Sequence, residues 1–240
     1  MANTLPKIAL GAWAWGNDGT FGGNMTEETL RPIFDTAMAN GLNLWDTAYA
    51  YGMGTSEKVL AGFLKDQPRE SYLVSDKFTP QCANGKPTAM ADMIEMQLDL
   101  MGLDRFDIYW IHNVADAPHW TEELAKFYEG KDNVPLLGVS NHNLAEIKQA
   151  NEILKAHGLK LSAVQNHFSL INRSSEDSGM HRKREWERMR SNCKDGLRAV
   201  LFYMLSKAAN RSRQARMCSM KSLVMDDGTI PFFTASPTSR

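Results

Sequence analysis

Cysteine is scarce in this sequence, and the few cysteines lie far apart. Cys82, Cys193 and Cys218 are the only three among 240 residues. Their spacing provides neither a disulfide framework nor a set of cysteine ligands for a metal, so we expect no bound metal. Few cysteines without close pairs are also typical of a protein from a reducing compartment.

Long apolar runs and an excess of charge are missing as well. No stretch approaches the roughly 20 apolar residues that a membrane-spanning helix needs, so we expect no membrane partner. Residues 1–7 lack the charged start and apolar run of a signal peptide, which predicts a cytoplasmic location. The formal net charge of -1 argues against a nucleic-acid partner. With 43% hydrophobic residues, the chain can still form a sizeable core.

The charge is divided unevenly along the chain. Residues 1–171 contain 13 Lys+Arg and 21 Asp+Glu, whereas residues 172–240 contain 14 and 7. Ten of the thirteen arginines lie in that second stretch. We interpret residues 176–240 as an atypical Arg-rich segment, which a reading-frame shift or a truncation after about Glu176 would produce. The alternative is a basic appendage that binds a polyanion.

Strand-like and helix-like patterns alternate through residues 1–175. Short apolar segments predict buried strands over residues 8–13, 42–47, 72–77, 107–111, 135–140 and 162–168. Between them, apolar residues recur at helical spacing, with helix starts at Thr26 and Asn143 and helix stops at Gly41, Gly102 and Gly158. Strands that alternate with helices predict an α/β fold with a parallel sheet covered by helices.

Two folds have this arrangement: an open doubly wound sheet and a (β/α)8 TIM barrel. The glycines after the first strand do not have the Gly-x-Gly-x-x-Gly spacing of the open fold. Polar residues end several successive strands, which favours the barrel, because its active site gathers at that face. Residues 199–205 could form a seventh strand, and nothing after them indicates an eighth strand-helix unit. We therefore predict an incomplete barrel with strands one to six recognisable.

Four chemically active side chains follow the second, third and fourth predicted strands: Asp46, Tyr51, Lys77 and His112. A tyrosine hydroxyl usually has a pKa of ~10, and a nearby ammonium group lowers such a value. A carboxylate would hold that ammonium in place, and a histidine could donate a hydrogen bond to a carbonyl oxygen as it gains charge. Together they could protonate a carbonyl oxygen while a nicotinamide or flavin delivers hydride.

Each of the four residues also has an ordinary structural explanation. Asp46 could be a turn residue, Tyr51 a core residue and Lys77 a solvated strand end. His112 could be a hydrogen-bonded structural histidine. Their occurrence together at three successive strand ends favours a catalytic site over four unrelated coincidences.

Five motifs in register resemble the aldo-keto reductases. They are Asp46-Thr47-Ala48-x-x-Tyr51-Gly52, Ser75-Asp76-Lys77, Ile111-His112, Gly138-Val139-Ser140-Asn141 and Val164-Gln165-Asn166. Their order and spacing agree with the family over residues 5–175. The resemblance implies a (β/α)8 barrel and an NADP-dependent oxidoreductase that reduces a small-molecule aldehyde or ketone with NADPH. It says nothing about the oligomeric state.

The resemblance also implies a role for each matching residue. Tyr51 would be the general acid, Lys77 would make its hydroxyl more acidic, Asp46 would pair with Lys77, and His112 would orient the substrate carbonyl. The implied cofactor-binding residues are Gly11, Ala12, Trp13, Asp46, Ser140, Asn141 and Gln165. Trp45 and Tyr49 either shape the substrate pocket or pack in the core.

The sequence departs from the family where the cofactor phosphates would bind. The family uses a Lys-Ser pair followed shortly by Arg, whereas Lys221-Ser222 is followed by no basic residue before Arg240. Two alternatives to an enzyme therefore stay open. One is a non-catalytic binding protein on the same fold, as in the potassium-channel β-subunits. The other is an inactive fragment whose first and sixth strands remain open edges.

Overall fold

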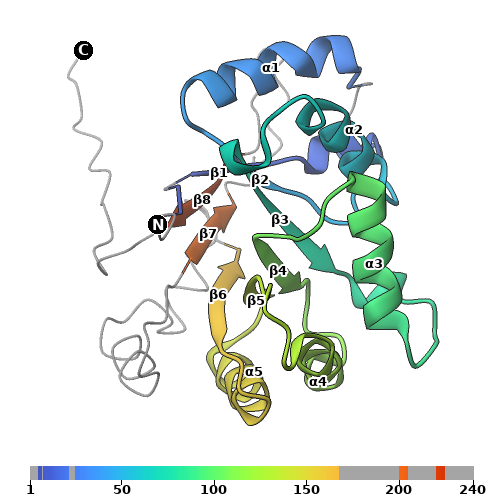
Figure 1. Ribbon diagram of the computed structural model, residues 1–240, viewed down its shortest axis with the longest axis vertical. Helices are drawn as coiled ribbons and strands as arrows, with labels where there is room; N and C mark the ends of the chain where they lie inside the picture. Colours follow the sequence, from blue (N-terminus) through green and yellow to red (C-terminus); the bar gives the residue numbers. More distant parts are fainter. Residues whose placement is uncertain (1–4, 7, 22–24, 168–199, 205–219, 225–240) are drawn as a thin grey trace.

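The computed structural model describes residues 5–6, 8–21, 25–167, 200–204 and 220–224, and only the backbone of the last two ranges (Figure 1). The strands are β1 (Ala9–Gly11), β2 (Leu44–Asp46), β3 (Leu73–Phe78), β4 (Ile108–Ile111), β5 (Leu136–Ser140), β6 (Leu161–Asn166), β7 (Val200–Met204) and β8 (Met220–Val224). The α-helices are α1 (Glu27–Ala39), α2 (Thr55–Leu64), α3 (Ala89–Met101), α4 (Ala117–Tyr128) and α5 (Leu144–Ala156). Short 3-10 helices are η1 (Trp13–Gly16), η2 (Arg69–Ser71) and η3 (Pro80–Cys82).

The eight strands form a closed barrel in chain order. From β1 to β7 each strand is parallel to the next, and helices α1 to α5 lie outside the strands (Figure 1). The predicted fold class, an incomplete (β/α)8 barrel with strands one to six recognisable, is confirmed. The predicted seventh strand is present as β7.

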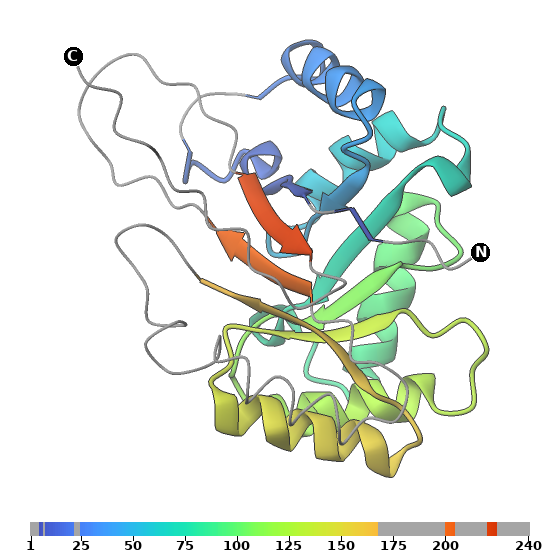
Figure 2. The ribbon, with the colours of Figure 1, turned by 90° about the vertical axis from the view of Figure 1, so that its left-hand side faces the viewer.

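Strand β8 is the departure from a regular barrel. It pairs antiparallel with both β7 and β1, and it closes the sheet between them (Figure 2). No eighth strand-helix unit was recognisable from the sequence, and β8 is an eighth strand that follows β7. The edges of β1 and β6, which the inactive-fragment alternative would leave open, are both paired. An antiparallel strand needs no crossover helix, so β8 lacks the strand-helix pattern by which the other strands were found. The rest of the predicted Arg-rich segment lies outside the described residues.

The core has two layers because successive side chains of a strand point to opposite faces. The inner layer fills the barrel with Ala9, Leu44, Ile108, Trp110 and Ala163. The outer layer lies between the strands and the helices, and its largest side chains include those of Phe34, Trp45, Phe63, Phe78 and Tyr109. The side chains at the carboxyl ends of the strands are thus held from the inside and from the outside.

The helix boundaries follow the predicted signals closely. Asn143 accepts hydrogen bonds from the backbone N–H groups of Ala145 and Glu146, and Glu146 accepts one from Asn143 in return. Thr26 and Thr29 form the same kind of reciprocal cap on α1. Such caps satisfy N–H groups that the first turn of a helix leaves without partners. They fix where α1 and α5 begin, and so the length of the loops on that side of the barrel.

Candidate active site

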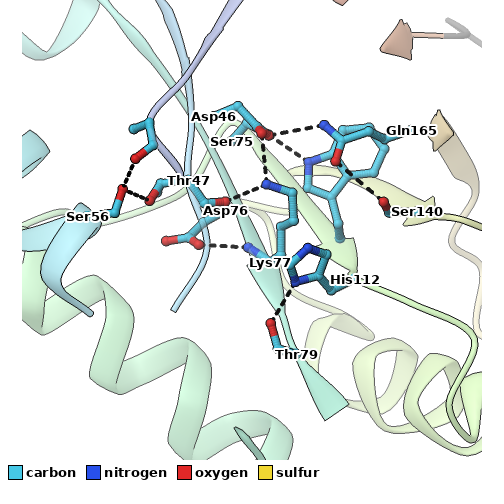
Figure 3. A network of polar contacts seen from close by, with 12 residues as sticks. Asp46, Thr47, Ser56, Ser75, Asp76, Lys77, Thr79, His112, Ser140 and Gln165 are labelled. Carbon is cyan, nitrogen blue, oxygen red and sulfur yellow. Dashed lines mark hydrogen bonds and ion pairs between the residues drawn. The ribbon is translucent and has the colours of Figure 1, made fainter. Parts of the chain in front are cut away.

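A buried ion pair lies at the carboxyl ends of β2 and β3. The Nζ atom of Lys77 donates to Oδ2 of Asp46 at 2.8 Å and to the carbonyl oxygen of Thr47 at 2.6 Å (Figure 3). Both charged side chains have an exposed fraction of 0%. Burial alone would lower the pKa of Lys77, but the negative charges and the hydrogen bond around it, those of Asp46 first and then of Tyr51 and Asp76, together raise that pKa above its usual value. Lys77 is therefore held as an ammonium ion.

The second oxygen of Asp46 is also held in place. Its Oδ1 accepts hydrogen bonds from Ser75 Oγ at 2.8 Å and from Gln165 Nε2 at 3.3 Å (Figure 3). Ser75 accepts in turn from the indole N–H of Trp110 at 2.7 Å. These contacts link β2 to β3 and β4 through Ser75, and they link β2 directly to β6 through Gln165. It fixes the orientation of the carboxylate and therefore the position of the Lys77 ammonium.

Tyr51 lies on the loop after β2, and only 4% of its surface is exposed. The Lys77 Nζ is 4.9 Å from the centre of its ring. The ring of Trp13 is stacked on one side, and the ring of His112 meets it nearly edge-on, with centroids 5.6 Å apart. The structure thus brings together all four residues that the sequence analysis selected as catalytic.

Two glycines let the Tyr51 loop approach the loop after β1. A Cβ atom on Gly16 would lie 2.6 Å from the carbonyl carbon and oxygen of Tyr51. Gly52 has a φ of +70°, and a Cβ atom there would lie 2.1 Å from the Gly16 oxygen. Ser56 strengthens this contact by donating to the Ala12 carbonyl at 2.7 Å. The position of the Tyr51 ring therefore depends on backbone contact between two loops.

His112 follows directly after β4, and Thr79 sets its orientation. The Thr79 hydroxyl lies 2.8 Å from His112 Nδ1 (Figure 3). When that hydroxyl donates to Nδ1, the proton of the neutral ring is on Nε2. The sequence analysis missed Thr79. The available signal was its position two residues after Lys77, because alternate residues of a strand point to the same face.

Ser140, Asn141 and Gln165 meet at the carboxyl ends of β5 and β6. Asn141 donates from Nδ2 to Ser140 Oγ at 3.1 Å, and Ser140 Oγ donates to Gln165 Oε1 at 3.4 Å. Asn141 has a left-handed backbone with a φ of 63°, which asparagine tolerates better than most residues. One hydroxyl and two carboxamides offer donors and acceptors that match a carboxamide group. This chemistry fits the predicted nicotinamide site.

The predicted residues near β1 lie at the same end of the barrel. Gly11 ends β1, and the backbone N–H of Ala12 donates to the Asp46 carbonyl at 2.8 Å. Trp13 begins η1 and contacts Tyr51 as described above. Lys221 and Ser222 lie within β8, where Lys221 is paired with Ala9, but their side chains lie outside the described residues.

Trp45 does not take part in the site. It is 1% exposed, and its ring is stacked on Phe34 with centroids 4.9 Å apart. Of the two explanations for Trp45, core packing is therefore the correct one. Tyr49 is partly buried and packs against the same outer layer of the core.

Metal binding and membrane insertion can be considered for the described residues. Within those residues, no group of three or more His, Cys, Asp or Glu side chains has the arrangement of a metal site. No helix found there combines the length and the apolar character needed to cross a membrane.

Comparison with known proteins identifies relatives along most of the chain. A sequence model described as "Aldo/keto reductase family" matches residues 7–220. The chain is 29% identical over 190 residues to the chloroplastic pyridoxal reductase of Arabidopsis thaliana, covering 72% of this chain and 52% of that protein. It is 26% identical over 195 residues to the NADH-specific methylglyoxal reductase of Escherichia coli strain K12, covering 72% and 58%. The chain spans about half the length of these curated relatives.

Solved structures show the same architecture. The thermostable aldo-keto reductase Tm1743, determined with the inhibitor epalrestat, superposes with a TM-score of 0.67 at 21% identity, covering 83% of this chain and 68% of that one. An aldo-keto reductase from Klebsiella pneumoniae, determined in complex with NADPH, gives a TM-score of 0.61 at 22% identity, covering 75% and 61%. At these identities the likeness is one of fold.

Proposed function

The chain belongs to the aldo/keto reductase family, and we propose that it reduces an aldehyde or ketone to an alcohol with NADPH as the hydride donor. One observation carries the proposal. The Tyr51 ring lies beside a buried ammonium, 4.9 Å from Lys77 Nζ, and meets the His112 ring edge-on. A hydroxyl, a fixed positive charge and an imidazole in one place are what protonation of a carbonyl oxygen requires.

Tyr51 is the general acid in this proposal. Its hydroxyl would donate a proton to the carbonyl oxygen, and a bound nicotinamide would be the source of hydride for the carbonyl carbon. Proton transfer leaves a phenolate on Tyr51, and the Lys77 ammonium stabilises that negative charge. Because Asp46 holds Lys77 through a 2.8 Å hydrogen bond, the ammonium is already in place before the reaction and needs no rearrangement.

His112 orients the carbonyl group. With Thr79 donating to Nδ1 over 2.8 Å, the Nε2 proton of a neutral imidazole is available to the carbonyl oxygen. That hydrogen bond gains strength as negative charge develops on the oxygen, so it favours the transition state over the bound substrate. Tyr51 and His112 would then approach the same oxygen from two sides.

Ser140, Asn141 and Gln165 would hold the carboxamide and one face of the nicotinamide ring. Gly11, Ala12 and Trp13 would line the cofactor next to β1. NADPH is proposed over NADH from the family resemblance, and the E. coli relative, by its name, is NADH-specific. Activity therefore has to be measured with NADPH and with NADH.

All of these site residues fall within residues 1–175, which we propose as the barrel portion that carries the activity. We propose the remaining residues, 176–240, as a segment of different character, although its strands β7 and β8 close the barrel. The cytoplasmic location remains a prediction.

The direct test is turnover of NADPH by the full chain. Purified protein is mixed with NADPH and a panel of small aldehydes and ketones, and the loss of the reduced nicotinamide is followed by its absorbance. A parallel series uses NADH. We expect substrate-dependent oxidation of NADPH and formation of the alcohol. Saturable NADPH binding without turnover on any carbonyl compound would instead favour the non-catalytic binding protein, and a folded sample that binds neither nucleotide would reject the proposal.

A further inference from the structure

A second pair of carboxyl groups lies behind the site, on the outer face of β3. Asp76 is next to Lys77 in sequence, so its side chain points away from the barrel interior and toward α2 and α3. Glu57 comes from the first turn of α2 and lies against it. Both side chains have an exposed fraction of 0%. The Lys77 ammonium is directed at Asp46, not at either of these carboxyl groups.

Gln97 of α3 joins the two carboxyl groups. Its Nε2 lies 3.0 Å from Glu57 Oε1 and 3.0 Å from Asp76 Oδ1. The hydroxyl of Tyr109 donates to the other end of the same amide, Gln97 Oε1, at 2.6 Å. Because Oε1 is taken by that donor, the amide nitrogen must face the carboxyl groups. Two buried carboxyl groups therefore share one neutral donor.

The remaining oxygen of each carboxyl group lacks a donor. Among the described residues, Glu57 Oε2 and Asp76 Oδ2 are buried atoms without a hydrogen-bond partner. The two groups are nevertheless close enough for a hydrogen bond between them. Two ionised carboxylates in such contact would repel each other in a water-free environment. A single proton between them removes the repulsion and supplies the donor that is missing.

We propose that Glu57 and Asp76 share one proton. This proton limits the negative charge behind Lys77 to one unit, so that the Lys77 ammonium can stabilise a phenolate on Tyr51. The effect on Lys77 and Tyr51 rests on the proposed carbonyl reduction, whereas the shared proton itself does not. Asp76 carries the proton and donates it to the Glu57 carboxylate. Glu57 keeps the charge, because it lies in the first turn of α2, where the helix dipole favours an anion.

The direction of both pKa shifts agrees with a shared proton. Burial raises the pKa of Asp76 well above the usual carboxyl range, and the charge of Glu57 raises it further. Burial also raises the pKa of Glu57, against the lowering effect of the Gln97 hydrogen bond. The other titratable groups that face the pair are Lys77, Tyr109 and Cys82. Burial raises the pKa of Tyr109 and of Cys82, so neither adds charge at neutral pH.

The pair reaches the active site through the backbone of Lys77. Asp76 Oδ1 accepts from the Lys77 backbone N–H at 2.7 Å, and Gln97 Nε2 donates to the Lys77 carbonyl at 3.2 Å. Both peptide groups of Lys77 are thus held from the outer face, while its Nζ is held from the inner face. Loss of the shared proton would add a second negative charge near Lys77. That charge would oppose a phenolate on Tyr51 and make Tyr51 a weaker acid. Glu57 and Asp76 are therefore positioning residues.

The first test looks for the proton itself. The infrared spectrum of the full chain at neutral pH should contain the C=O stretching band of a buried, protonated carboxyl group. Asp76→Asn and Glu57→Gln should each abolish that band, because the carboxyl group that remains has an amide donor and ionises. Asp99→Asn, which removes an exposed carboxyl group of α3, should keep it. A wild-type spectrum without the band, or a band that survives both substitutions, would overturn the proposal.

The second test uses linkage between pH and stability. The native pair keeps one proton that the unfolded chain loses above the ordinary carboxyl pKa of about 4. Native protein then binds more protons than unfolded protein, so its stability falls as pH rises through this window. The folding equilibrium constant of the wild type should fall about tenfold per pH unit relative to Asp76→Asn. Parallel stability curves for the two proteins would contradict a shared proton.

The third test asks whether the proton affects catalysis. In the wild type, kcat should fall as the pair loses its proton and Tyr51 becomes a weaker acid, and this step should be absent from the pH profile of Asp76→Asn, because the charge behind Lys77 no longer changes there. Asp99→Asn should leave the profile in place. An unchanged Asp76→Asn profile in an active enzyme would reject the tuning role. If the chain proves inactive, the infrared band and the stability curves still decide whether the proton is shared, so failure of the proposed function is distinguishable from failure of this inference.

Discussion

The indole ring of Trp13 is stacked on the phenol ring of Tyr51, with centroids 5.3 Å apart and planes inclined by 14°. The indole N–H donates to Asp18 Oδ2 at 2.9 Å, so the ring is held from its outer edge as well. Trp13 comes from the segment after β1 and Tyr51 from the loop after β2. One fluorophore therefore reports on the place where proton donor and nicotinamide are proposed to meet.

We expect NADPH to quench the tryptophan fluorescence of the full chain saturably at micromolar concentrations. The physical reason is the predicted contact of the nicotinamide with Trp13. Trp13→Phe keeps an aromatic ring against Tyr51 and removes this fluorophore, so most of the quenching should disappear while binding, followed by calorimetry, persists. Quenching of equal size in Trp13→Phe would place the nucleotide near other tryptophans and contradict the predicted site.

Tyr51→Phe removes the proton donor and keeps the ring. The contacts of that ring with Trp13 and with the Lys77 ammonium need no hydroxyl, so we expect folding and NADPH affinity to remain close to wild type. Carbonyl reduction should fall by about 10²- to 10⁴-fold, the usual contribution of a general acid. Steady-state kinetics and a nucleotide titration on the same sample measure both effects. Activity within a few-fold of the wild type would exclude Tyr51 as the acid.

Lys77→Met tests the buried ion pair. It leaves the Asp46 carboxylate in a fully buried position without its ammonium partner, and breaking a buried pair in this way costs about 3–5 kcal/mol. We expect a loss of that size in the free energy of unfolding, measured by urea denaturation. Lys126→Met is the matched control, because Lys126 is exposed and pairs with partly exposed glutamates on the same helix. It should change stability little. Similar losses in the two variants would mean that Lys77 does not hold a buried charge.

Thr79→Val tests whether the hydroxyl selects the tautomer of His112. Valine has nearly the same shape but donates no hydrogen bond to Nδ1, so the Nε2 proton is no longer favoured. We expect kcat/KM for carbonyl reduction to fall roughly three- to tenfold, the value of one hydrogen bond. Thr79→Ser retains the hydroxyl and should recover most of the activity. If serine were no better than valine, packing and not the hydrogen bond would explain the effect of Thr79.

The sequence was sufficient to predict that the side chains of the site lie together because they obey a simple geometric rule. Parallel strands of a barrel all end at the same face, so Asp46, Lys77 and His112 had to approach one another once the strands were assigned. The caps at Thr26 and Asn143 were predictable for a similar reason, since they depend only on residues three or four positions apart. The local patterns, together with the repeated strand-helix unit, therefore predict most of strands β1 to β6.

Features that depend on contacts between distant segments could not be read from those patterns. Gln97 reaches the back of the site from the middle of α3, where a buried glutamine has no distinctive spacing. Asp76 stood in the Ser75-Asp76-Lys77 motif, but nothing in the sequence showed that it faces Glu57. Strand β8 was missed because it runs against its neighbours, and its pairing with β1 is a long-range choice that no local signal records.

The contact between Gly16 and the backbone of Tyr51 provides a final prediction. A methyl group on Gly16 would lie 2.6 Å from Tyr51 C and O, and backbone atoms cannot rotate away as a side chain can. Gly16→Ala must therefore push the Tyr51 loop outward. We expect it to cost about 1–3 kcal/mol of stability, as overpacking does, and to reduce carbonyl reduction by displacing the hydroxyl.

Gly62→Ala is the matched control for this substitution. Gly62 lies in α2, a Cβ atom there would meet nothing within 4 Å, and alanine favours a helix by up to about 1 kcal/mol over glycine. Urea denaturation should therefore show Gly62→Ala at or above wild-type stability and Gly16→Ala below it, with activity lost only in the latter. Equal behaviour of the two variants would mean that the loops after β1 and β2 are not in the tight contact that positions Tyr51, and the proton donor would then have to be held by Lys77 and Trp13 alone.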